Sequence, residues 1–255
     1  MNASAIQKYL QGSSMKQLSI DYNTSIREVR NFLNQNNIHI RNRSEQNVFS
    51  NQQRSLYVNN SFFEVLNPIV VYYLGFLAAD GTVSGSRNSV KVGLANVDRD
   101  WLIQMKEDLE IERPIRDYQT TKGYFVSEIT FSSAIIKNTL ARYSIVPRKT
   151  YVGVSMENIP NELKIHYIRG YFDGDGSYSS GKVKITSKTK GILSEIEKYM
   201  GLNSYLYYFE KREVYSLEYS TIPSLNFLEK IYADPSRKLD RKWKKYQEEL
   251  IRREQ

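Results

Sequence analysis

The 255-residue chain contains no cysteine and only two histidines, His39 and His166. Without thiols it cannot form disulfides, thiolate zinc sites or a cysteine nucleophile, and cysteine-dependent protein splicing is excluded. Two histidines leave few candidates for imidazole metal sites or histidine-centred acid–base catalysis. A catalytic centre would therefore depend on carboxylates, amines and backbone carbonyls.

Long apolar runs are also absent. The longest, residues 68–79, is shorter than the roughly 20 residues that span a bilayer. The N-terminus has no basic stretch followed by an apolar one, so no signal peptide is predicted. With 40% hydrophobic and 25% charged residues the composition is that of a globular protein. We expect an intracellular, cytoplasmic protein without a membrane partner.

The net charge of +8 is concentrated at the two ends of the chain. Residues 1–60 hold seven Lys/Arg against three Asp/Glu, and residues 236–255 hold eight against four, so the segment between them is neutral overall. Two basic ends on a neutral body favour contact with a polyanion such as nucleic acid, although two merely solvated ends give the same pattern.

Residues 1–45 are predicted to form a small all-α module of three helices, because apolar residues recur there at helical spacing between polar turns. The pattern resembles the helix-turn-helix of recombinases and transposases, in which one helix enters the major groove. It implies DNA contacts from Arg27, Arg30 and Asn31 on the third helix. A protein-interaction bundle is the alternative.

A polar linker is predicted over residues 46–66, which are rich in Asn, Gln and Ser. The remainder divides into two similar halves, 67–150 and 151–255, the second ending in a basic helix.

An internal duplication relates these halves. The segment 73–81 (YLGFLAADG) matches 168–176 (IRGYFDGDG), and 146–149 (VPRK) matches 239–242 (LDRK). Between these landmarks both halves show the same periodicities, which predict an αββαββα order with antiparallel sheets. The fold class expected is therefore α+β, a pseudo-twofold pair plus the N-terminal module.

Each motif segment predicts a helix with a stripe of small residues. Gly75 and Ala79 lie four apart in the first, and Gly170 and Gly174 lie four apart in the second. Glycine within a helix costs about 1 kcal/mol relative to alanine. Its recurrence at matching positions predicts that the two helices pack closely on each other.

Both predicted helices end in Asp-Gly, at Asp80 and Asp175, with the glycine expected in a left-handed C-terminal conformation. A carboxylate is unfavourable at the negative end of a helix dipole, and helix pairing would bring the two carboxylates together. The same local rule broken twice points to a functional site, where a divalent cation with oxygen ligands would reverse the repulsion.

With these residues, the chain resembles the LAGLIDADG (dodecapeptide, DOD-type) homing endonucleases in their single-chain, two-motif form, over residues 67–250. The resemblance implies a site-specific endonuclease that hydrolyses both strands of a long DNA target as a monomer, each half cutting one strand. It implies Mg²⁺ or Mn²⁺ held by Asp80 and Asp175 with the carbonyls of Ala79 and Gly174. A basic residue after each half, matching Lys149 and Lys242, would act in catalysis.

The same resemblance implies that the sheets form a saddle on the DNA. Strands 89–95 and 182–187 alternate polar and apolar residues, so one face of each would meet the major groove. We expect DNA contacts from Lys91 in the first half. In the second half and its basic tail, we expect them from Lys182, Lys184, Lys188 and Arg241. The alternative is a non-cleaving binder on the same fold, either an intron RNA maturase or a transcription regulator.

Overall fold

The computed structural model describes residues 1–43, 45–46, 57–233 and 235–254. The chain separates into two compact units, Met1–Leu56 and Tyr57–Gln255. The predicted linker, 46–66, falls partly outside the described residues, at 47–56. Residues 57–66 belong to the second unit, where Val58 and Phe63 are buried in the core. Among the described residues, no helix has the length and apolarity to cross a membrane.

The described part of the first unit includes the helices α1 (Ala3–Leu10), α2 (Met15–Asp21) and α3 (Ile26–Gln35). Ser25 begins α3 with a reciprocal capping box, in which its hydroxyl accepts from the Glu28 backbone and the Glu28 carboxylate accepts from the Ser25 backbone. The small core consists of Tyr9, Leu18, Val29 and Leu33. The three helices predicted within residues 1–45 are therefore present.

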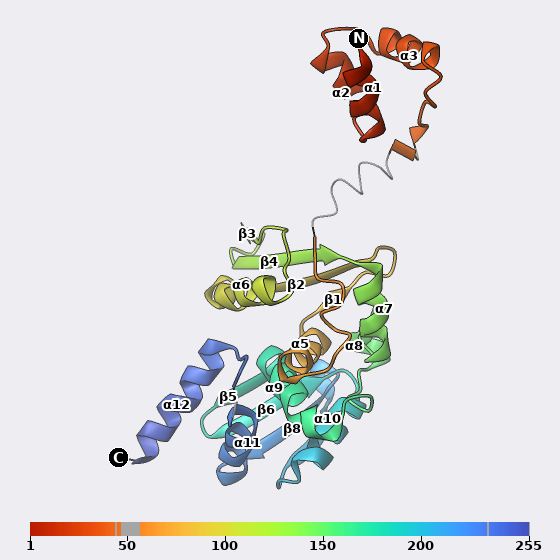
Figure 1. Cartoon of the computed structure of the whole chain (residues 1–255). Coiled ribbons are helices and arrows are strands. Elements are labelled where there is room, and N and C mark those ends of the chain that lie inside the picture. Colours follow the sequence, from red (N-terminus) through yellow and green to blue (C-terminus); the bar gives the residue numbers. More distant parts are fainter. Residues whose placement is uncertain (44, 47–56, 234, 255) are drawn as a thin grey trace. The chain divides into compact units, whose positions relative to one another are not determined.

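The second unit contains two four-stranded sheets, each with its own helices (Figure 1). The first comprises α5 (Pro68–Ala79), β1 (Thr82–Val83), β2 (Ser89–Ala95), α6 (Arg99–Asp108), β3 (Arg116–Gln119), β4 (Phe125–Ser132), α7 (Ala134–Arg142) and α8 (Lys149–Val152). The second comprises α9 (Lys164–Asp175), β5 (Gly176–Ser179), β6 (Lys182–Ser187), α10 (Lys190–Met200), β7 (Tyr205–Phe209), β8 (Val214–Ser220), α11 (Ile222–Tyr232) and α12 (Asp240–Glu254).

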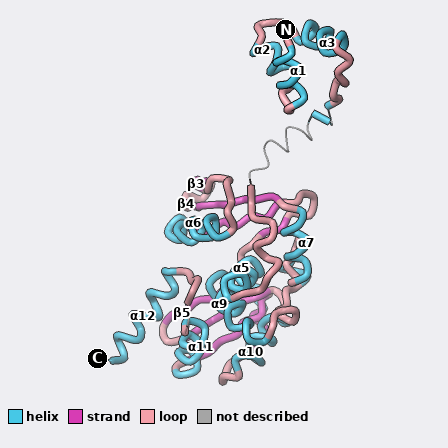
Figure 2. The backbone as a smooth tube through the Cα atoms, in the orientation of Figure 1, coloured by secondary structure: helices cyan, strands magenta, loops and turns pink. Residues whose placement is uncertain are grey.

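The two halves have the same sheet topology, which confirms the predicted fold class. The strand orders are β1-β2-β4-β3 and β5-β6-β8-β7, and all pairs are antiparallel. Helices α6 and α7 contact β2, and helices α10 and α11 contact β6, so one face of each sheet is covered. The backbone trace in Figure 2 shows α5 and α9 together between the two sheets.

The registers agree with the alternation expected for half-buried sheets. On β2, Val90, Val92 and Leu94 are buried and the residues between them are more exposed. On β6, Val183 and Ile185 are buried against Tyr219 and Leu217, their partners on β8. Each sheet therefore has an inner face in the core and an outer face away from it.

One detail of the helix ends differs from expectation. Neither Gly81 nor Gly176 has a positive φ angle, so the predicted left-handed cap is wrong. Gly176 is extended, at φ −86° and ψ 163°. A side chain there would overlap the Phe172 ring and lie 2.6 Å from the Phe172 carbonyl oxygen. Close approach, and not a left-handed turn, explains this glycine.

Candidate functional site

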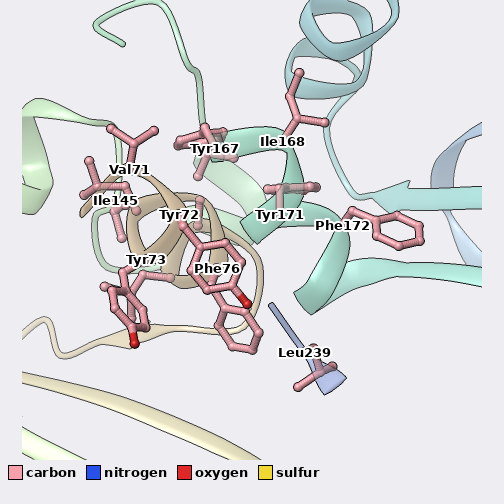
Figure 3. Packing of buried hydrophobic residues seen from close by; sticks show 14 of the residues in the cluster. Val71, Tyr72, Tyr73, Phe76, Ile145, Tyr167, Ile168, Tyr171, Phe172 and Leu239 are labelled. Carbon is pink, nitrogen blue, oxygen red and sulfur yellow. The ribbon is translucent and has the colours of Figure 1, made fainter. Parts of the chain in front are cut away.

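The site is built on the C-terminal ends of α5 and α9. Helix α5 begins at Pro68, where the Asn67 side chain accepts hydrogen bonds from the backbone of Ile69 and Val70. Helix α5 is apolar throughout and buried from Val70 to Ala78, and α9 is buried from Tyr167 to Asp173, because the two helices pack on each other. Figure 3 shows the aromatic residues of the pair, including Tyr72 and Phe76 from α5 and Tyr171 and Phe172 from α9.

The two helix backbones lie in direct contact at the glycines. A side chain at Gly75 would overlap the carbonyl oxygen of Tyr167, and one at Gly170 would overlap that of Tyr72. One turn further, a side chain at Gly174 would overlap the Cβ of Ala79. All four residues of the predicted stripe therefore lie between the helices. The crossing fixes where the two helices end relative to one another.

The crossing of the two helices brings Asp80, at the end of α5, close to Asp175, at the end of α9. An ideal Cβ at Gly174, the residue before Asp175, would lie 3.6 Å from the Asp80 carboxyl carbon. Both residues retain exposed surface, yet protein atoms surround their carboxyl groups. This loss of solvent, together with the negative charge of Asp80, raises the pKa of Asp175 to about 6. Desolvation also raises the pKa of Asp80.

Lys149 is buried beside the end of α5. Its ammonium donates hydrogen bonds to the carbonyl oxygens of Ala78 at 2.7 Å and Ala79 at 2.6 Å. The last carbonyl groups of a helix have no partner within the helix, so the lysine satisfies them. A cation at this end also interacts favourably with the negative end of the helix dipole. Burial lowers the pKa of Lys149, against the opposing attraction of Asp175 and Asp80.

Lys242 occupies the matching position at the end of α9. Its ammonium donates to the carbonyl oxygens of Phe172 and Asp173, both at 2.7 Å, of Gly174 at 3.3 Å and of Gly176. Burial lowers the pKa of Lys242 to about 8. The two lysines that the sequence pairs with the motifs are thus both held at motif-helix ends.

Electrostatic coupling crosses between the halves. Two negative charges raise the pKa of Lys149, and the charge of Asp175 does so more than the charge of Asp80. Asp80 in turn is influenced more strongly by Lys242 than by Lys149. A hollow of about 40 Å³, room for a water molecule or an ion, is lined by residues from both halves, including Ala79, Lys149 and Asp175. Each carboxylate is therefore close enough to the lysines of both halves to interact with them electrostatically.

Asp173 is a residue whose place sequence reasoning missed. It is buried and accepts hydrogen bonds from the hydroxyls of Tyr72 at 2.9 Å and Tyr232 at 2.7 Å, and from the backbone of Leu239 at 2.8 Å. It therefore fixes the segment that leads to Lys242. Its adjacency to the motif was visible in the sequence, but its donors lie up to 101 positions away.

The C-terminal segment is also tied to the first half by two ion pairs. Arg237 contacts Asp108 through two hydrogen bonds of 2.7 Å, and Asp108 also accepts from the Tyr73 hydroxyl. Arg241, a predicted DNA contact, binds the buried Asp98 at 3.0–3.3 Å. The arginine fork suits such two-oxygen contacts. The segment that carries Lys242 is thus held between the halves.

The remaining predicted DNA contacts lie on outer surfaces. Three of the sheet lysines are in ion pairs: Lys91 with Glu128 at 3.2 Å, Lys184 with Glu218 at 2.8 Å, and Lys188 with Glu213 at 3.6 Å. Lys182 is exposed at the start of β6. In the first unit, Arg27, Arg30 and Asn31 are exposed on α3.

Two curated relatives were found by sequence. The chain is 26% identical over 211 residues to an uncharacterized protein of Methanocaldococcus jannaschii, covering 75% of this chain and 73% of that protein. It is 29% identical over 140 residues to one of the proteins of the A-type ATP synthase of Methanopyrus kandleri, covering 54% of this chain. The match spans only 13% of that synthase protein.

Solved structures of similar arrangement include mesophilic variants of the homing endonuclease I-DmoI, at 17% identity and a TM-score of 0.45, covering 68% of this chain and 92% of that one. They also include the N-terminal LAGLIDADG domain of DUF199/WhiA, at 16% identity and a TM-score of 0.45, covering 68% and 89%. Likeness of this degree carries no argument about activity.

A family model gives the more specific result. Residues 162–232 match the LAGLIDADG-like domain, and this segment contains α9, the sheet β5-β6-β8-β7 and α11. The second half of this chain therefore contains a segment that matches a LAGLIDADG-like domain, and the first half has the same sheet topology.

Proposed function

We propose that this chain is a site-specific DNA endonuclease that makes a double-strand break by metal-dependent hydrolysis of phosphodiester bonds. The observation that carries the proposal is the meeting of Asp80 and Asp175 at the crossing of α5 and α9, with a buried lysine at each helix end. Two desolvated carboxylates that repel each other are unfavourable unless a cation lies between them.

The donor set fits Mg²⁺ or Mn²⁺. Within the described part of the chain, neither carboxylate forms a hydrogen bond or an ion pair, so their oxygens are available. The carbonyls of Ala79 and Gly174 accept from lysines, but a carbonyl oxygen has two lone pairs. Mg²⁺ commonly takes one or two carboxylates and completes its shell with water and substrate phosphate. Asp80, Asp175, Ala79 and Gly174 would therefore hold the cation.

Such an ion, when bound, polarises the phosphodiester and makes a nearby water more acidic. The protein's own residues do the positioning. Lys149 and Lys242 are fixed by carbonyl hydrogen bonds, so each ammonium is held close to the carboxylates. Lys242, whose pKa burial lowers to about 8, brings an ammonium group to the end of α9. Lys149 supplies positive charge for the transition state.

The substrate proposed is double-stranded DNA with a long target site. Two sheets of the same topology, one in each half, present outer faces with lysines such as Lys91 and Lys182. Strand pairs of this width can enter the major groove. Because both motifs lie in one chain, a monomer suffices for two half-sites. A DNA substrate also fits the intracellular location expected from the sequence.

The first unit is proposed as a helix-turn-helix that contacts the same class of DNA. Asn23 adopts φ 44° in the turn before α3, and Arg27, Arg30 and Asn31 are exposed on that helix. Replacing Arg27 and Arg30 by Gln in the full chain should shorten the footprint on target DNA. It should also make the affinity for DNA less dependent on salt concentration. An unchanged footprint would favour the protein-interaction bundle.

Cleavage of a plasmid library with Mg²⁺ tests the central proposal. Wild type is compared with Asp80→Asn and Asp175→Asn, each checked for folding and for DNA binding. We expect both variants to lose cleavage by at least about 100-fold while retaining binding. Equal cutting by all three proteins would refute the endonuclease.

A non-cleaving nucleic-acid binder is the second candidate, either an RNA maturase or a transcription regulator. One observation favours it: Lys149 and Lys242 already donate to the carbonyl oxygens of Ala79 and Gly174, the two backbone atoms that the proposed cation would need. If neither wild type nor variants cut any DNA while all bind it, this candidate replaces the first.

A further inference from the structure

The outer face of the second sheet contains a hollow that the proposed cleavage site does not use. Its volume is about 200 Å³, smaller than the roughly 300–1,000 Å³ of pockets for drug-sized ligands. The residues that line it come from β6, β7, β8 and the turn before β8, and they are Lys184, Thr186, Phe209, Arg212, Val214 and Ser216. A space of this size suits one planar ring.

The strand register explains why these side chains gather there. Thr186 is directly opposite Ser216, and Phe209 is directly opposite Val214. Residues that are directly opposite in a sheet project from the same face. Leu217, the neighbour of Ser216, is buried in the core, so Ser216 and Val214 belong to the outer face.

Ser216 provides an observation that points to a ligand. It is 0% exposed although it belongs to the outer face, and its Oγ has no hydrogen-bond partner among the described residues. Buried hydroxyls nearly always have a partner, so an orphaned one calls for an explanation. A ligand with a hydrogen-bonding edge, seated in the hollow, would supply the missing partner.

The walls of the hollow suit a nucleobase with its phosphate. Phe209 offers an aromatic ring that is 38% exposed, with the Arg212 guanidinium 5.9 Å from the ring centroid. Lys184 lies at another wall, where Glu218 pairs with it at 2.8 Å. An aromatic ring for stacking, hydroxyls for the base edge and a guanidinium for phosphate are the groups that bind unpaired nucleotides.

The first sheet differs at the corresponding place. The strand pairing makes Lys91 of the first sheet equivalent to Lys184 of the second. Two residues further along, Gly93 and its partner Glu128 therefore correspond to Thr186 and its partner Ser216. Glu128 is a carboxylate paired with Lys91 at 3.2 Å. A carboxylate there would repel a phosphate, so the duplicated halves have diverged at this position.

We propose that this hollow binds one unpaired base of a nucleic acid, with the ring against Phe209, the base edge at the hydroxyls of Thr186 and Ser216, and the phosphate near Arg212. The inference rests on the nucleic-acid binding in the proposed function but not on cleavage. An unpaired base reaches such a site from a single strand or by extrusion from a duplex, and both DNA and RNA can supply it.

Fluorescence anisotropy with labelled pyrimidine oligonucleotides of about 12 residues tests the proposal, at one fixed salt concentration and without divalent cations. The probes are single-stranded DNA, single-stranded RNA and a perfect DNA duplex. The variants are Phe209→Leu, which removes the ring but keeps an apolar side chain, and Ser216→Ala, which removes a hydroxyl without a partner among the described residues. Phe125→Leu is the matched control, an aromatic residue 66% exposed on the first sheet.

We expect Phe209→Leu to weaken single-strand binding by about tenfold and Ser216→Ala by about threefold, with duplex binding changed less than twofold. Ser216→Ala should leave the melting temperature unchanged, and Phe125→Leu should leave all three affinities unchanged. If these losses are seen, the single strand that the wild type binds more tightly, DNA or RNA, identifies the nucleic acid that supplies the base. Unchanged single-strand affinity in Phe209→Leu and Ser216→Ala would overturn it, as would an equal loss on the duplex. The endonuclease is judged separately, by Asp80→Asn in the cleavage assay.

Discussion

Gly170 packs directly against the backbone of Tyr72, where α9 crosses α5. A Cβ at Gly170 would overlap the Tyr72 carbonyl oxygen and lie 2.8 Å from the Phe76 backbone nitrogen. Gly75 has the reciprocal relationship with Tyr167. The position of the two carboxylates therefore depends on two backbones that touch without side chains between them.

Gly170→Ala should destabilise the protein strongly, because the atoms it would meet are backbone and cannot move aside. We expect a loss of about 3 kcal/mol or more in the free energy of unfolding, a fall in melting temperature of about 6–12 °C for a unit of this size. Thermal unfolding followed by circular dichroism measures the change.

Gly191→Ala is the control for that substitution. Gly191 lies in α10, and a Cβ there would meet nothing within 4 Å. Alanine is the better helix former, so stability should rise by up to about 1 kcal/mol. Equal effects of the two substitutions would mean that the helix crossing is not the constraint proposed.

The sequence predicted this fold well because each half repeats the same local signals. Strands β2 and β6 have the bounds expected from periodicity. Asn67 followed by Pro68 marks the start of α5 in the sequence and in the structure. Duplication supplied an internal check, since a pattern seen twice at a fixed offset rarely arises from local propensity alone.

The electrostatics of the site could not be predicted in the same way. Asp98 and Arg241 are 143 positions apart, and neither residue type nor spacing indicates their pairing. The crossed coupling of Lys149 with Asp175 likewise depends on how two helices cross. The hollow at Ser216 arises from a difference between the halves, which a search for repeats does not detect.

Asp175→Asn should stabilise the protein at neutral pH. The folded-state pKa of Asp175 is raised from 3.8 to about 6, so its favourable contribution is complete below pH 3.8 and is lost as the pH rises through about 6. Above that pH the ionised carboxylate is a cost that asparagine removes. Because the residue retains exposed surface, we expect only about 1 kcal/mol, or about 2–4 °C, at pH 7.5.

The same comparison at pH 4 should show almost no difference in melting temperature. Adding Mg²⁺ at pH 7.5 should raise the melting temperature of wild type but not of Asp175→Asn, since a ligand that binds only the folded state stabilises it. A variant that is destabilised at pH 7.5 would contradict the repulsion between the carboxylates.

Lys149 and Asp175 should act on the same DNA strand, although they come from different halves. Their coupling across the pseudo-twofold axis predicts that Lys149→Met and Asp175→Asn impair cleavage of the same strand. The double variant should be little worse than either single one, as for groups that act as a unit. A nicking assay with each strand end-labelled separates the strands. If Lys149→Met instead impairs cleavage of the same strand as Asp80→Asn, each half works alone.

Asp108→Asn should disturb the site from a distance through Lys242. Asp108 binds Arg237 with two hydrogen bonds of 2.7 Å, and the segment after Arg237 leads to Lys242. The pair is largely buried, with about a fifth of each side chain exposed, so removing one charge should cost about 1–3 kcal/mol.

Cleavage of the strand that depends on Lys242 should fall in this variant, while the strand that depends on Lys149 is cut at the wild-type rate. Glu213→Gln is the matched control, because Glu213 is 78% exposed in a 3.6 Å pair with Lys188 and should change stability by less than about 0.5 kcal/mol. Equal loss on both strands would mean that Asp108 supports the whole fold and does not act through the segment that carries Lys242.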